Sequence, residues 1–271
     1  MKINALSIGE KWLPFQQTGT EYFFTVHSVF NRVINIKTDR ELLSIVACNT
    51  GGSSSFLSLA DREVNFGVAA GERCVSRSGQ LCLAEHRISF INAPLWKGPI
   101  YKEYRYNKIK KENIEAFKAV LDRKAAPQSA WRYINSESES RFSGLRAIQK
   151  LRGNPSLVKS LIGLGQGLTP AGDDMLVGFL AMVNHVSGNG EFVRMLHSAV
   201  ADSLHRTVDI SAQILDNALD CDYHEYIQNC IRDLCEGEKE EVYISAASLM
   251  SIGATSGSDI ACGMYFGMID N

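Results

Sequence analysis

The chain has 271 residues, 45% of them hydrophobic, so it is long enough to bury one large core or two modest ones and does not have the composition of a disordered protein. Its formal net charge is -2 at pH 7 and its pI is about 6.3. Proteins that bind nucleic acid usually carry a clear basic excess, so this charge excludes nucleic acid as an expected partner.

The cysteine pattern and the length of the apolar stretches indicate in which cellular compartment the protein is expected. The seven cysteines are odd in number and form no C-x-x-C pair, which is unlike a disulfide framework or a zinc ribbon and favours reduced thiols. Residues Met1 to Pro14 lack the basic-then-apolar pattern of an export signal. The longest apolar stretch, Met175 to Val186, is well short of the roughly 20 residues that cross a bilayer. We therefore expect a cytoplasmic protein with no membrane-spanning segment.

The N-terminal part has the pattern of short β-strands. Between Tyr22 and Ala93, segments rich in β-branched and aromatic residues alternate with turn residues. Two turns, Thr38 to Arg40 and Arg77 to Gly79, have the polar, glycine-tolerant chemistry of hairpin connections. The pattern predicts a mainly antiparallel sheet or small barrel, with strands over Tyr22 to Ile36, Glu41 to Cys48, Phe56 to Leu59, Leu81 to Ala84 and Arg87 to Ile91.

After Pro99 the pattern becomes helical. Tyr104 to Arg123 predicts an amphipathic helix, and the polar, proline-containing stretch Lys124 to Ser140 is expected to link two domains, residues 1–124 and 141–271. The fold class is therefore α+β, a β-rich N-terminal domain followed by a helical domain. Helices are expected over Arg141 to Leu151, Pro155 to Ile162, Asp173 to Val186, Glu191 to Leu219, Tyr223 to Cys235, Glu241 to Met250 and Asp259 to Met268.

The segment from Gly163 to Asp174 combines glycines, a threonine and two aspartates directly before an apolar helix. Thr169 is expected to be the N-cap, with Pro170 at the first helical position, so that free backbone N–H groups point out of the helix start. Such an end attracts anions, and glycines let the backbone approach a ligand closely. We expect a small anionic substrate here, bound by Thr169 and by Gly165, Gly167 and Gly172.

A second segment, Gly253 to Asp259, echoes the first. With a one-residue offset inside the loop, the matching pairs are Gly167 with Gly253, Thr169 with Thr255, Gly172 with Gly257, Asp174 with Asp259 and Gly178 with Gly263. The helix from Asp259 to Met268 is apolar nearly all round, which indicates a buried central helix, and the Gly263/Gly267 spacing would let a neighbouring helix come close. Two such helices side by side would aim their starts at one ligand, with binding residues Thr255, Ser256 and Gly257.

Each loop also has a purely structural interpretation, because glycine often makes the turn before a helix and Thr, Ser and Asp are common caps. Three roles stay open for the aspartates: helix capping, a general base, or a Mg²⁺ site that bridges to a phosphate oxygen. All three stay candidates for catalysis. For Asp173 and Asp259, capping ranks first, a base second and a metal third, while Asp174 is expected to face the ligand. Neither loop contains His or Cys, so no transition metal is expected.

A third candidate segment runs from His205 to Ser211. Thr207 and Ser211 are four residues apart and are therefore expected on one helix face, where Arg206 would supply positive charge to the substrate. The alternative for Arg206 is a hydrated surface side chain, with the two hydroxyls bonded back to the helix. In the β-rich half, His27-Ser28 and Asn49 to Ser53 are weaker candidates, and a hairpin loop explains the latter stretch.

These segments, in this order, resemble a bacterial family long catalogued as a domain of unknown function, which includes the third subunit of the oxamate carbamoyltransferase of allantoin degradation. Family members carry a G-x-G-x-G-L-T-P-x-x-D-D-x-L-x-G signature, present here from Gly163 to Gly178, and a G-x-T-S-G-x-D-x-x-x-G signature, present from Gly253 to Gly263. The T-x-x-x-S segment corresponds to Thr207 to Ser211. Val29 to Ile36 resembles the family's N-terminal v-f-x-r-x-x-N-l segment, so the resemblance covers most of the chain.

The resemblance implies a cytoplasmic subunit that acts with two dissimilar partner subunits to interconvert oxalurate plus phosphate with oxamate plus carbamoyl phosphate. These ligands are small anions, and carbamoyl transfer develops charge on a carbonyl oxygen and on the leaving phosphate, which N–H donors would stabilise. Because the amide nitrogen of oxamate is a poor nucleophile, a general base would help, and Asp174 is the candidate. The competing hypotheses are a non-catalytic module that binds a small anion or scaffolds its partners, and a stand-alone hydrolase that uses Asp173 and Asp174 with a metal.

Overall fold

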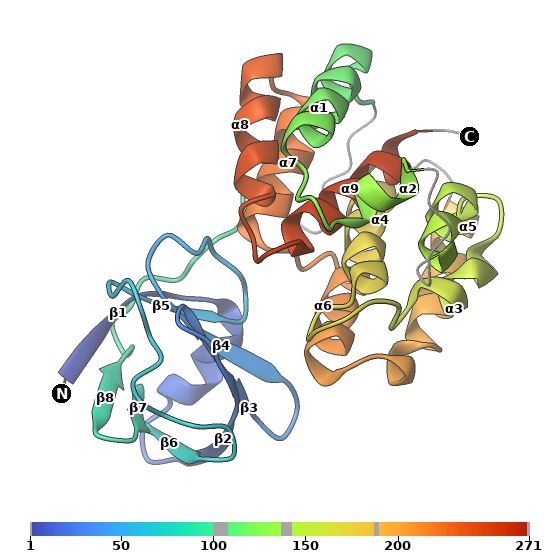
Figure 1. Ribbon diagram of the computed structural model, residues 1–271. Coiled ribbons are helices and arrows are strands. Elements are labelled where there is room, and N and C mark those ends of the chain that lie inside the picture. The colour runs from blue at the N-terminus through green and yellow to red at the C-terminus, as the bar shows by residue number, and fades with distance from the viewer. Residues whose placement is uncertain (1, 100–107, 137–142, 187–189, 270–271) are drawn as a thin grey trace. The chain divides into compact units, whose positions relative to one another are not determined.

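The computed structural model describes residues 2–99, 108–136, 143–186 and 190–269. The chain divides into two compact units, Met1–Gly98 and Pro99–Asn271, each with its own hydrophobic core (Figure 1). The expected fold class, a β-rich N-terminal part followed by a helical part, is confirmed.

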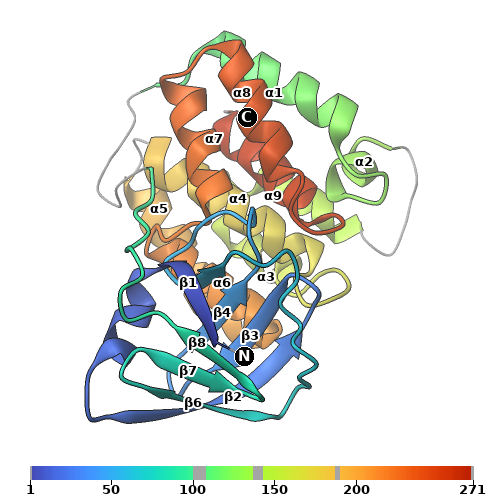
Figure 2. The ribbon, with the colours of Figure 1, turned by 90° about the vertical axis from the view of Figure 1, so that its left-hand side faces the viewer.

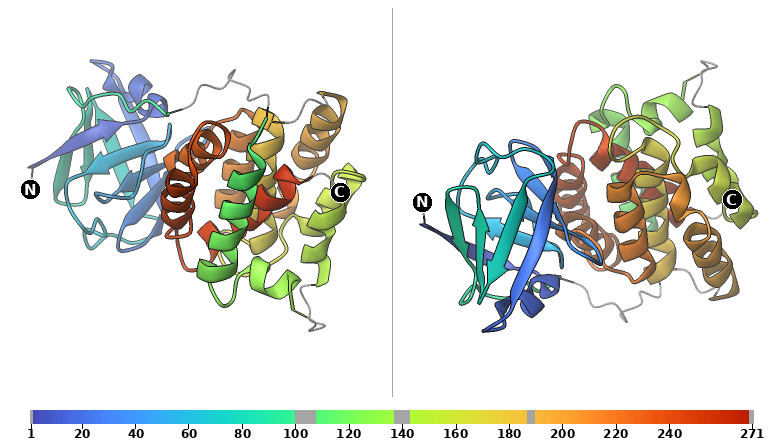
Figure 3. Two further views of the ribbon diagram at one scale, coloured as in Figure 1. Left: turned by 90° about the horizontal axis from the view of Figure 1, so that it is seen from above. Right: turned by 90° about the horizontal axis from the view of Figure 1, so that it is seen from below.

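The N-terminal unit is a closed β-barrel (Figure 3). Its strands are arranged in the order β1-β5-β4-β3-β2-β6-β7-β8. Neighbours pair antiparallel except β4 with β5 and β1 with β8, whose parallel pairing closes the barrel. The strands are β1 Lys2–Ile8, β2 Glu21–Val29, β3 Val33–Lys37, β4 Leu42–Val46, β5 Phe56–Leu59, β6 Arg73–Arg77, β7 Gln80–Leu83 and β8 His86–Ser89.

Both predicted hairpin turns are confirmed, since residues 38–40 join β3 to β4 and residues 78–79 join β6 to β7. Ser78 and Gly79 both have positive φ, as a tight two-residue hairpin turn requires. The predicted long strand Tyr22 to Ile36 is wrong, because the chain reverses between β2 and β3. Strands β1 and β6 were not predicted.

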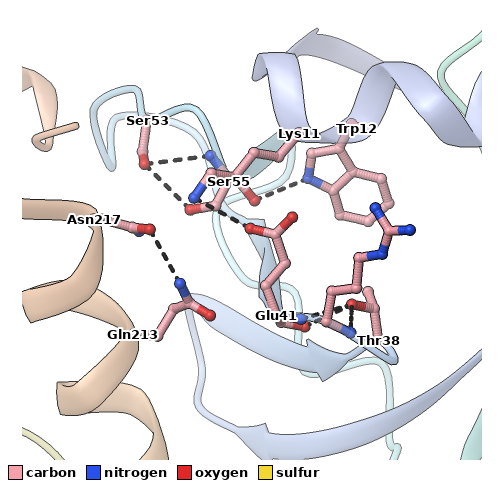
Figure 4. A network of polar contacts seen from close by, with 9 residues as sticks. Lys11, Trp12, Thr38, Glu41, Ser53, Ser55, Gln213 and Asn217 are labelled. Atoms are coloured by element: carbon pink, nitrogen blue, oxygen red, sulfur yellow. Dashed lines mark hydrogen bonds and ion pairs between the residues drawn. The ribbon is translucent and has the colours of Figure 1, made fainter. Parts of the chain in front are cut away.

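The stretch Asn49 to Ser53 is not a hairpin loop, because the strands that it connects, β4 and β5, pair in parallel. Just after it, the Ser55 carbonyl accepts a hydrogen bond at 2.9 Å from Nε1 of the buried Trp12 (Figure 4). Trp12 lies in a 3-10 helix, Glu10–Gln16, and its neighbour Lys11 forms an ion pair with Glu41. Within the loop itself, the Thr50 hydroxyl donates to the Ala47 carbonyl at 2.7 Å and the Ser53 hydroxyl bonds to that of Ser55 at 3.2 Å, so its polar residues have structural partners in the barrel unit.

The second unit is helical. Its α-helices are α1 Lys111–Lys124, α2 Ala130–Ile134, α3 Val158–Leu161, α4 Ala171–Val186, α5 Gly190–Ala201, α6 Asp209–Leu219, α7 Glu225–Cys235, α8 Lys239–Leu249 and α9 Ser256–Met268. Short 3-10 helices cover Ser143–Lys150, Pro155–Leu157 and Leu204–Arg206.

The structure corrects several predicted helix boundaries. The helix expected over Glu191 to Leu219 is three elements, because α5 ends at Ala201 and a 3-10 turn separates it from α6. The expected helices over Tyr104 to Arg123 and Arg141 to Leu151, and the linker Lys124 to Ser140, lie partly outside the described residues. Within those described, residues 143–150 form a 3-10 helix and α2 occupies the middle of the expected linker.

Helix α1 belongs to the helical unit, although the expected N-terminal domain of residues 1–124 included it. It packs against α8 and α9, and its buried Asn113 donates side-chain hydrogen bonds to the carbonyls of Asp233, Leu234 and Gly237 near the end of α7. The units therefore divide at residues 98 and 99, before α1.

Helices α4 and α9 form the centre of the helical unit and lie side by side (Figures 1 and 2). Every residue of α4 from Gly172 to His185 is buried, and the predicted burial of α9 is confirmed. The contacts of Met175 with Gly263 and of Phe179 with Gly267 advance together along both helices, so α4 and α9 run parallel and start at the same end.

Glycine is required at two points where these helices touch. A Cβ at Gly178 would lie 1.9 Å from the Ile260 carbonyl oxygen, and a Cβ at Gly263 would lie 1.9 Å from the Met175 carbonyl oxygen. Because both obstacles are backbone atoms of buried helices, no side-chain rotation relieves them.

We expect Gly178→Ala or Gly263→Ala to reduce the free energy of unfolding by about 3 kcal/mol or more, because α4 and α9 must separate to admit a methyl group. Gly190→Ala, at the exposed start of α5 where an added Cβ meets nothing within 4 Å, is the matched control and should be neutral or slightly stabilising. Urea unfolding of the three variants tests this. Equal stability of Gly178→Ala and Gly190→Ala would show that the two helices are not held by glycine contact.

Candidate functional site

The starts of α4 and α9 meet at a pair of hydroxyl groups. Thr169 Oγ1 and Ser256 Oγ lie 2.8 Å apart and share a hydrogen bond, although the two residues are 87 positions apart in the chain. Both side chains are partly exposed, whereas the helical residues that follow them are buried. The two loops singled out by the sequence therefore meet at one place, which we call the paired start.

The two loops also repeat each other in detail. A Cβ at Gly172 would lie 2.0 Å from the Leu161 carbonyl oxygen, and a Cβ at Gly257 would lie 2.0 Å from the Leu249 carbonyl oxygen. Each glycine thus lets its helix start lie against the end of the preceding helix, α3 or α8. The two loops have matching sequences because each makes the same local packing contact with the helix before it.

The same packing uses up most of the backbone donors that were expected to bind an anion. The Gly172 N–H donates to the Leu164 carbonyl at 2.8 Å, and the Gly257 N–H donates to the Ile252 carbonyl at 3.0 Å. The N–H groups of Asp173 and Asp174 both donate to the Pro170 carbonyl. The expectation that the N–H groups of this turn stay free is therefore largely wrong, because carbonyls of the loops themselves satisfy them.

The caps also differ from the expected ones. Helix α4 begins at Ala171, one residue later than expected, and the Thr169 hydroxyl bonds to Ser256 rather than to the first turn of its own helix. Thr255 is the N-cap of α9 but its side chain makes no capping bond to that helix. It bonds instead to the carboxyl group of Asp259.

Asp173 holds the first loop against the segment before α6. Its carboxylate accepts the Gly163 N–H at 2.7 Å and the Thr207 hydroxyl, and the Ser211 hydroxyl also bonds to it. Burial raises the pKa of Asp173, and these three hydrogen bonds oppose that rise. Thr207 lies before α6 rather than in it, so the expectation of a shared helix face is wrong, yet both hydroxyls reach the same carboxylate.

Asp259 has a corresponding role in the second loop. Its Oδ1 accepts the Ala130 N–H at 2.6 Å and so satisfies a donor at the start of α2. The neighbouring Ser258 hydroxyl accepts the Ala126 N–H at 3.0 Å. Burial raises the pKa of Asp259 to about 6, against the effect of its hydrogen bonds to Ala130 and Thr255. Ser258 was not among the predicted residues, because nothing local in the sequence indicates its partner 132 positions earlier.

Asp174 is the exception among the three aspartates. It is 3% exposed, and its Oδ2 atom is buried without a hydrogen-bond partner. Burial raises its pKa well above the usual carboxyl range; the hydroxyls of Ser256 and Thr169 lower it, and the charges of Asp259 and Asp173 raise it further. A buried carboxyl group whose pKa is shifted in this way is a candidate for a proton-transfer role.

The remaining predicted residues contribute less directly. Gly165, with φ of 141°, lies against Pro170 and Ala171, where a Cβ would come within 2.4 Å of the Ala171 nitrogen. Gly167 has positive φ and open space around it at the exposed loop tip. The exposed Arg206 directs its guanidinium to the Lys159 carbonyl in a weak contact of 3.5 Å. This contact is not with any residue of the paired start.

No group of three or more His, Cys, Asp and Glu side chains among the described residues is arranged to hold a metal ion. No described helix is long and apolar enough to cross a membrane.

Two protein-family models match the chain. One, described as oxamate carbamoyltransferase subunit AllH, matches residues 161–268, and the other, described as the AllH family N-terminal domain, matches residues 4–95. The first range contains both loops of the paired start, and the second contains almost the whole barrel. No solved structure matches the chain significantly.

The raised pKa of Asp259 predicts how stability depends on pH. The folded state holds this proton more tightly than the unfolded chain, so the free energy of unfolding should fall as pH rises from about 4 to above about 6, by about 3 kcal/mol from this group. Asp259→Asn should remove this contribution to the pH dependence of the free energy of unfolding, while Asp202→Asn, at an exposed position, should not. Chemical denaturation across this pH range measures the difference. Parallel pH profiles for the wild type and Asp259→Asn would contradict the assignment.

Proposed function

Because this chain belongs to the family of the oxamate carbamoyltransferase subunit AllH, we propose that its paired start takes part directly in carbamoyl transfer between carbamoyl phosphate and oxamate, or in the reverse reaction of oxalurate with phosphate. The chain would act in the cytoplasm, in allantoin degradation, together with two dissimilar partner subunits. The observation that carries the proposal is the buried Asp174 carboxyl, whose Oδ2 has no partner.

An unpartnered buried carboxyl costs folding free energy, so it calls for a compensating role. Asp173 and Asp259 each accept a backbone N–H from another segment, which explains their burial structurally. Asp174 accepts none in the described structure, and its only recorded partners are the two hydroxyls of Ser256 and Thr169. This difference supports a catalytic role for Asp174 and supporting roles for the other two.

The chemistry matches that assignment. In the forward direction the amide nitrogen of oxamate attacks the carbamoyl carbon, a C–N bond forms, and the C–O bond to phosphate breaks. The nitrogen must lose one proton, which Asp174 accepts and which finally leaves with phosphate. A carboxylate whose pKa is raised above the usual carboxyl range is a stronger base in this step, and burial raises the pKa of Asp174.

A non-catalytic module that binds an anion or scaffolds the partner subunits is the alternative. It is favoured by the backbone donors at Gly172 and Gly257, which are satisfied within the loops rather than left for a ligand. The two hypotheses differ in what loss of the Asp174 carboxyl does to turnover. A scaffold would assemble and support the reaction without it.

We expect Asp174→Asn to lower the rate of carbamoyl transfer by the reconstituted complex by about 10² to 10⁴, because the proton acceptor is lost while the shape is kept. Asp202→Asn, at an exposed position, is the matched control and should leave the rate unchanged. Steady-state assays with oxamate and carbamoyl phosphate measure both. Co-purification of the partner subunits with the Asp174→Asn chain should persist.

Wild-type turnover by a complex of normal composition that contains Asp174→Asn would favour the scaffold. Loss of turnover together with loss of assembly would also count against a catalytic Asp174, because it would place the residue in subunit docking. Thermal unfolding of the isolated Asp174→Asn chain shows whether the variant is folded, and so separates both outcomes from misfolding. A neutral side chain at this buried position should not lower the unfolding temperature at pH 7.

A further inference from the structure

The charge around the paired start is unfavourable for an anion. The charged neighbours that shift the pKa of Asp174 are Asp259 and Asp173, both negative. Arg206, the cation expected to compensate them, is exposed and directed to the Lys159 carbonyl. A phosphate or carboxylate placed here would therefore meet acidic groups before it met a cation.

The donors and acceptors also differ from those of an anion site. Within the described structure, the N–H groups of Ala171, Ser256 and Ser258 are the donors of these two helix starts without a recorded backbone acceptor. The same place also has an unpartnered carboxyl oxygen of Asp174, which can accept a hydrogen bond. The hydroxyls of Thr169 and Ser256 can each donate or accept one. The set is rich in acceptors and adaptable hydroxyls.

A primary amide is the group that fits this set. Its NH₂ donates two hydrogen bonds and its carbonyl accepts, and it carries no charge for the aspartates to repel. The NH₂ would donate to Asp174 Oδ2, and a Thr169 or Ser256 hydroxyl would donate to the carbonyl. The first bond gives Asp174 Oδ2 a partner that it now lacks, and the second replaces one of the hydrogen bonds that the hydroxyl now makes to Asp174 or to the other hydroxyl.

We propose that the paired start is an amide-selective half-site: it binds the –CO–NH₂ group of the substrate, and cationic side chains of a partner subunit bind the substrate's charged end. This inference rests on the proposed function and adds the group recognised and the division of the site between subunits. The sequence predicted that backbone N–H groups here bind an anion; the proposed half-site instead accepts hydrogen bonds from a neutral group.

Access to Asp174 requires only small movements. Its carboxyl lies behind two short side chains, Thr169 and Ser256, joined by one hydroxyl–hydroxyl hydrogen bond. Turning one of these side chains exchanges its bond to the other hydroxyl or to Asp174 for a bond to the ligand, without unfolding either helix.

The surface next to the paired start also suits a partner subunit. Leu168 and Val208 are each 39% exposed and directly adjoin Thr169 and Thr207 in the chain. Apolar side chains next to a site that lacks a cation provide contacts for a protein that brings one. The partner expected here presents Arg or Lys side chains towards the half-site.

The test is an NMR titration of the full-length chain at pH 8 with oxamate, oxalate and inorganic phosphate. Oxamate and oxalate have nearly the same shape, but oxalate replaces the amide with a second carboxylate. We expect oxamate to bind about tenfold to a hundredfold more tightly than oxalate, and phosphate to bind most weakly. Oxalate or phosphate binding as tightly as oxamate would overturn the proposal, and so would no binding of oxamate.

Asp174→Asn should abolish the preference, because the new side-chain NH₂ donates to a carboxylate as readily as the carboxylate accepted from an amide. Ser256→Ala provides a second variant that keeps the carboxyl: oxamate binding should weaken while oxamate remains preferred. Asp202→Asn should change neither affinity. An unchanged oxamate preference in Asp174→Asn would contradict the proposed contact.

A separate binding measurement tests whether a partner subunit supplies the cationic part of the site. Adding the partner subunits should tighten phosphate binding at least about tenfold relative to the isolated chain, since they supply the missing cations. No gain would contradict the half-site. These binding results are separate from turnover: if Asp174→Asn abolishes transfer but keeps the oxamate preference, the amide inference fails and the proposed function stands. If the preference is lost but turnover is normal, the proposed function fails.

Discussion

The organisation of the helical unit depends on the close approach of α4 and α9. Gly178 and Gly263 let each helix backbone touch a carbonyl oxygen of the other, which fixes the two helices in parallel and brings their starts together. Once the starts are together, Thr169 meets Ser256 and three aspartates are buried within one region. The polar site is thus a consequence of apolar packing between two helices, since no local feature of either loop would hold the two hydroxyls 2.8 Å apart.

The three buried carboxyl groups show how the surroundings separate structural from functional roles. Asp173 and Asp259 each accept a backbone N–H from a distant segment, and these bonds offset part of the cost of burial. Asp174 lies between the other two charges with one oxygen unpartnered. Two parallel helix starts favour negative charge at this point, whereas burial and the neighbouring carboxylates oppose it. Such a balance suits a group that exchanges protons, and it disfavours binding a second anion without help from another subunit.

Much of this arrangement could be predicted from the sequence, because the informative signals were local. The repeated Gly-Thr-Gly-Asp spacing predicted two matching helix starts, and the apolar surface of residues 259–268 predicted a buried helix. What failed depends on contacts between residues far apart in the chain. Asp259 bonds to Ala130 across 129 positions, and β1 closes the barrel by pairing in parallel with β8. Thr207 and Ser211 were expected to share a helix face, yet Thr207 reaches Asp173 from outside α6, because the chain turns at Thr207 before that helix begins.

Catalysis and amide binding at the paired start both depend on Asp174 Oδ2, which has no partner in the free protein and gains one when the ligand binds. A ¹³C NMR titration of the aspartate carboxyl carbons, with the Asp174 signal assigned by its absence in Asp174→Asn, measures this directly. Because it is buried, Asp174 is expected to keep its proton to a higher pH than exposed aspartates do, and its signal is expected to move when oxamate is added. Titration in the ordinary carboxyl range, with no response to oxamate, would contradict this expectation.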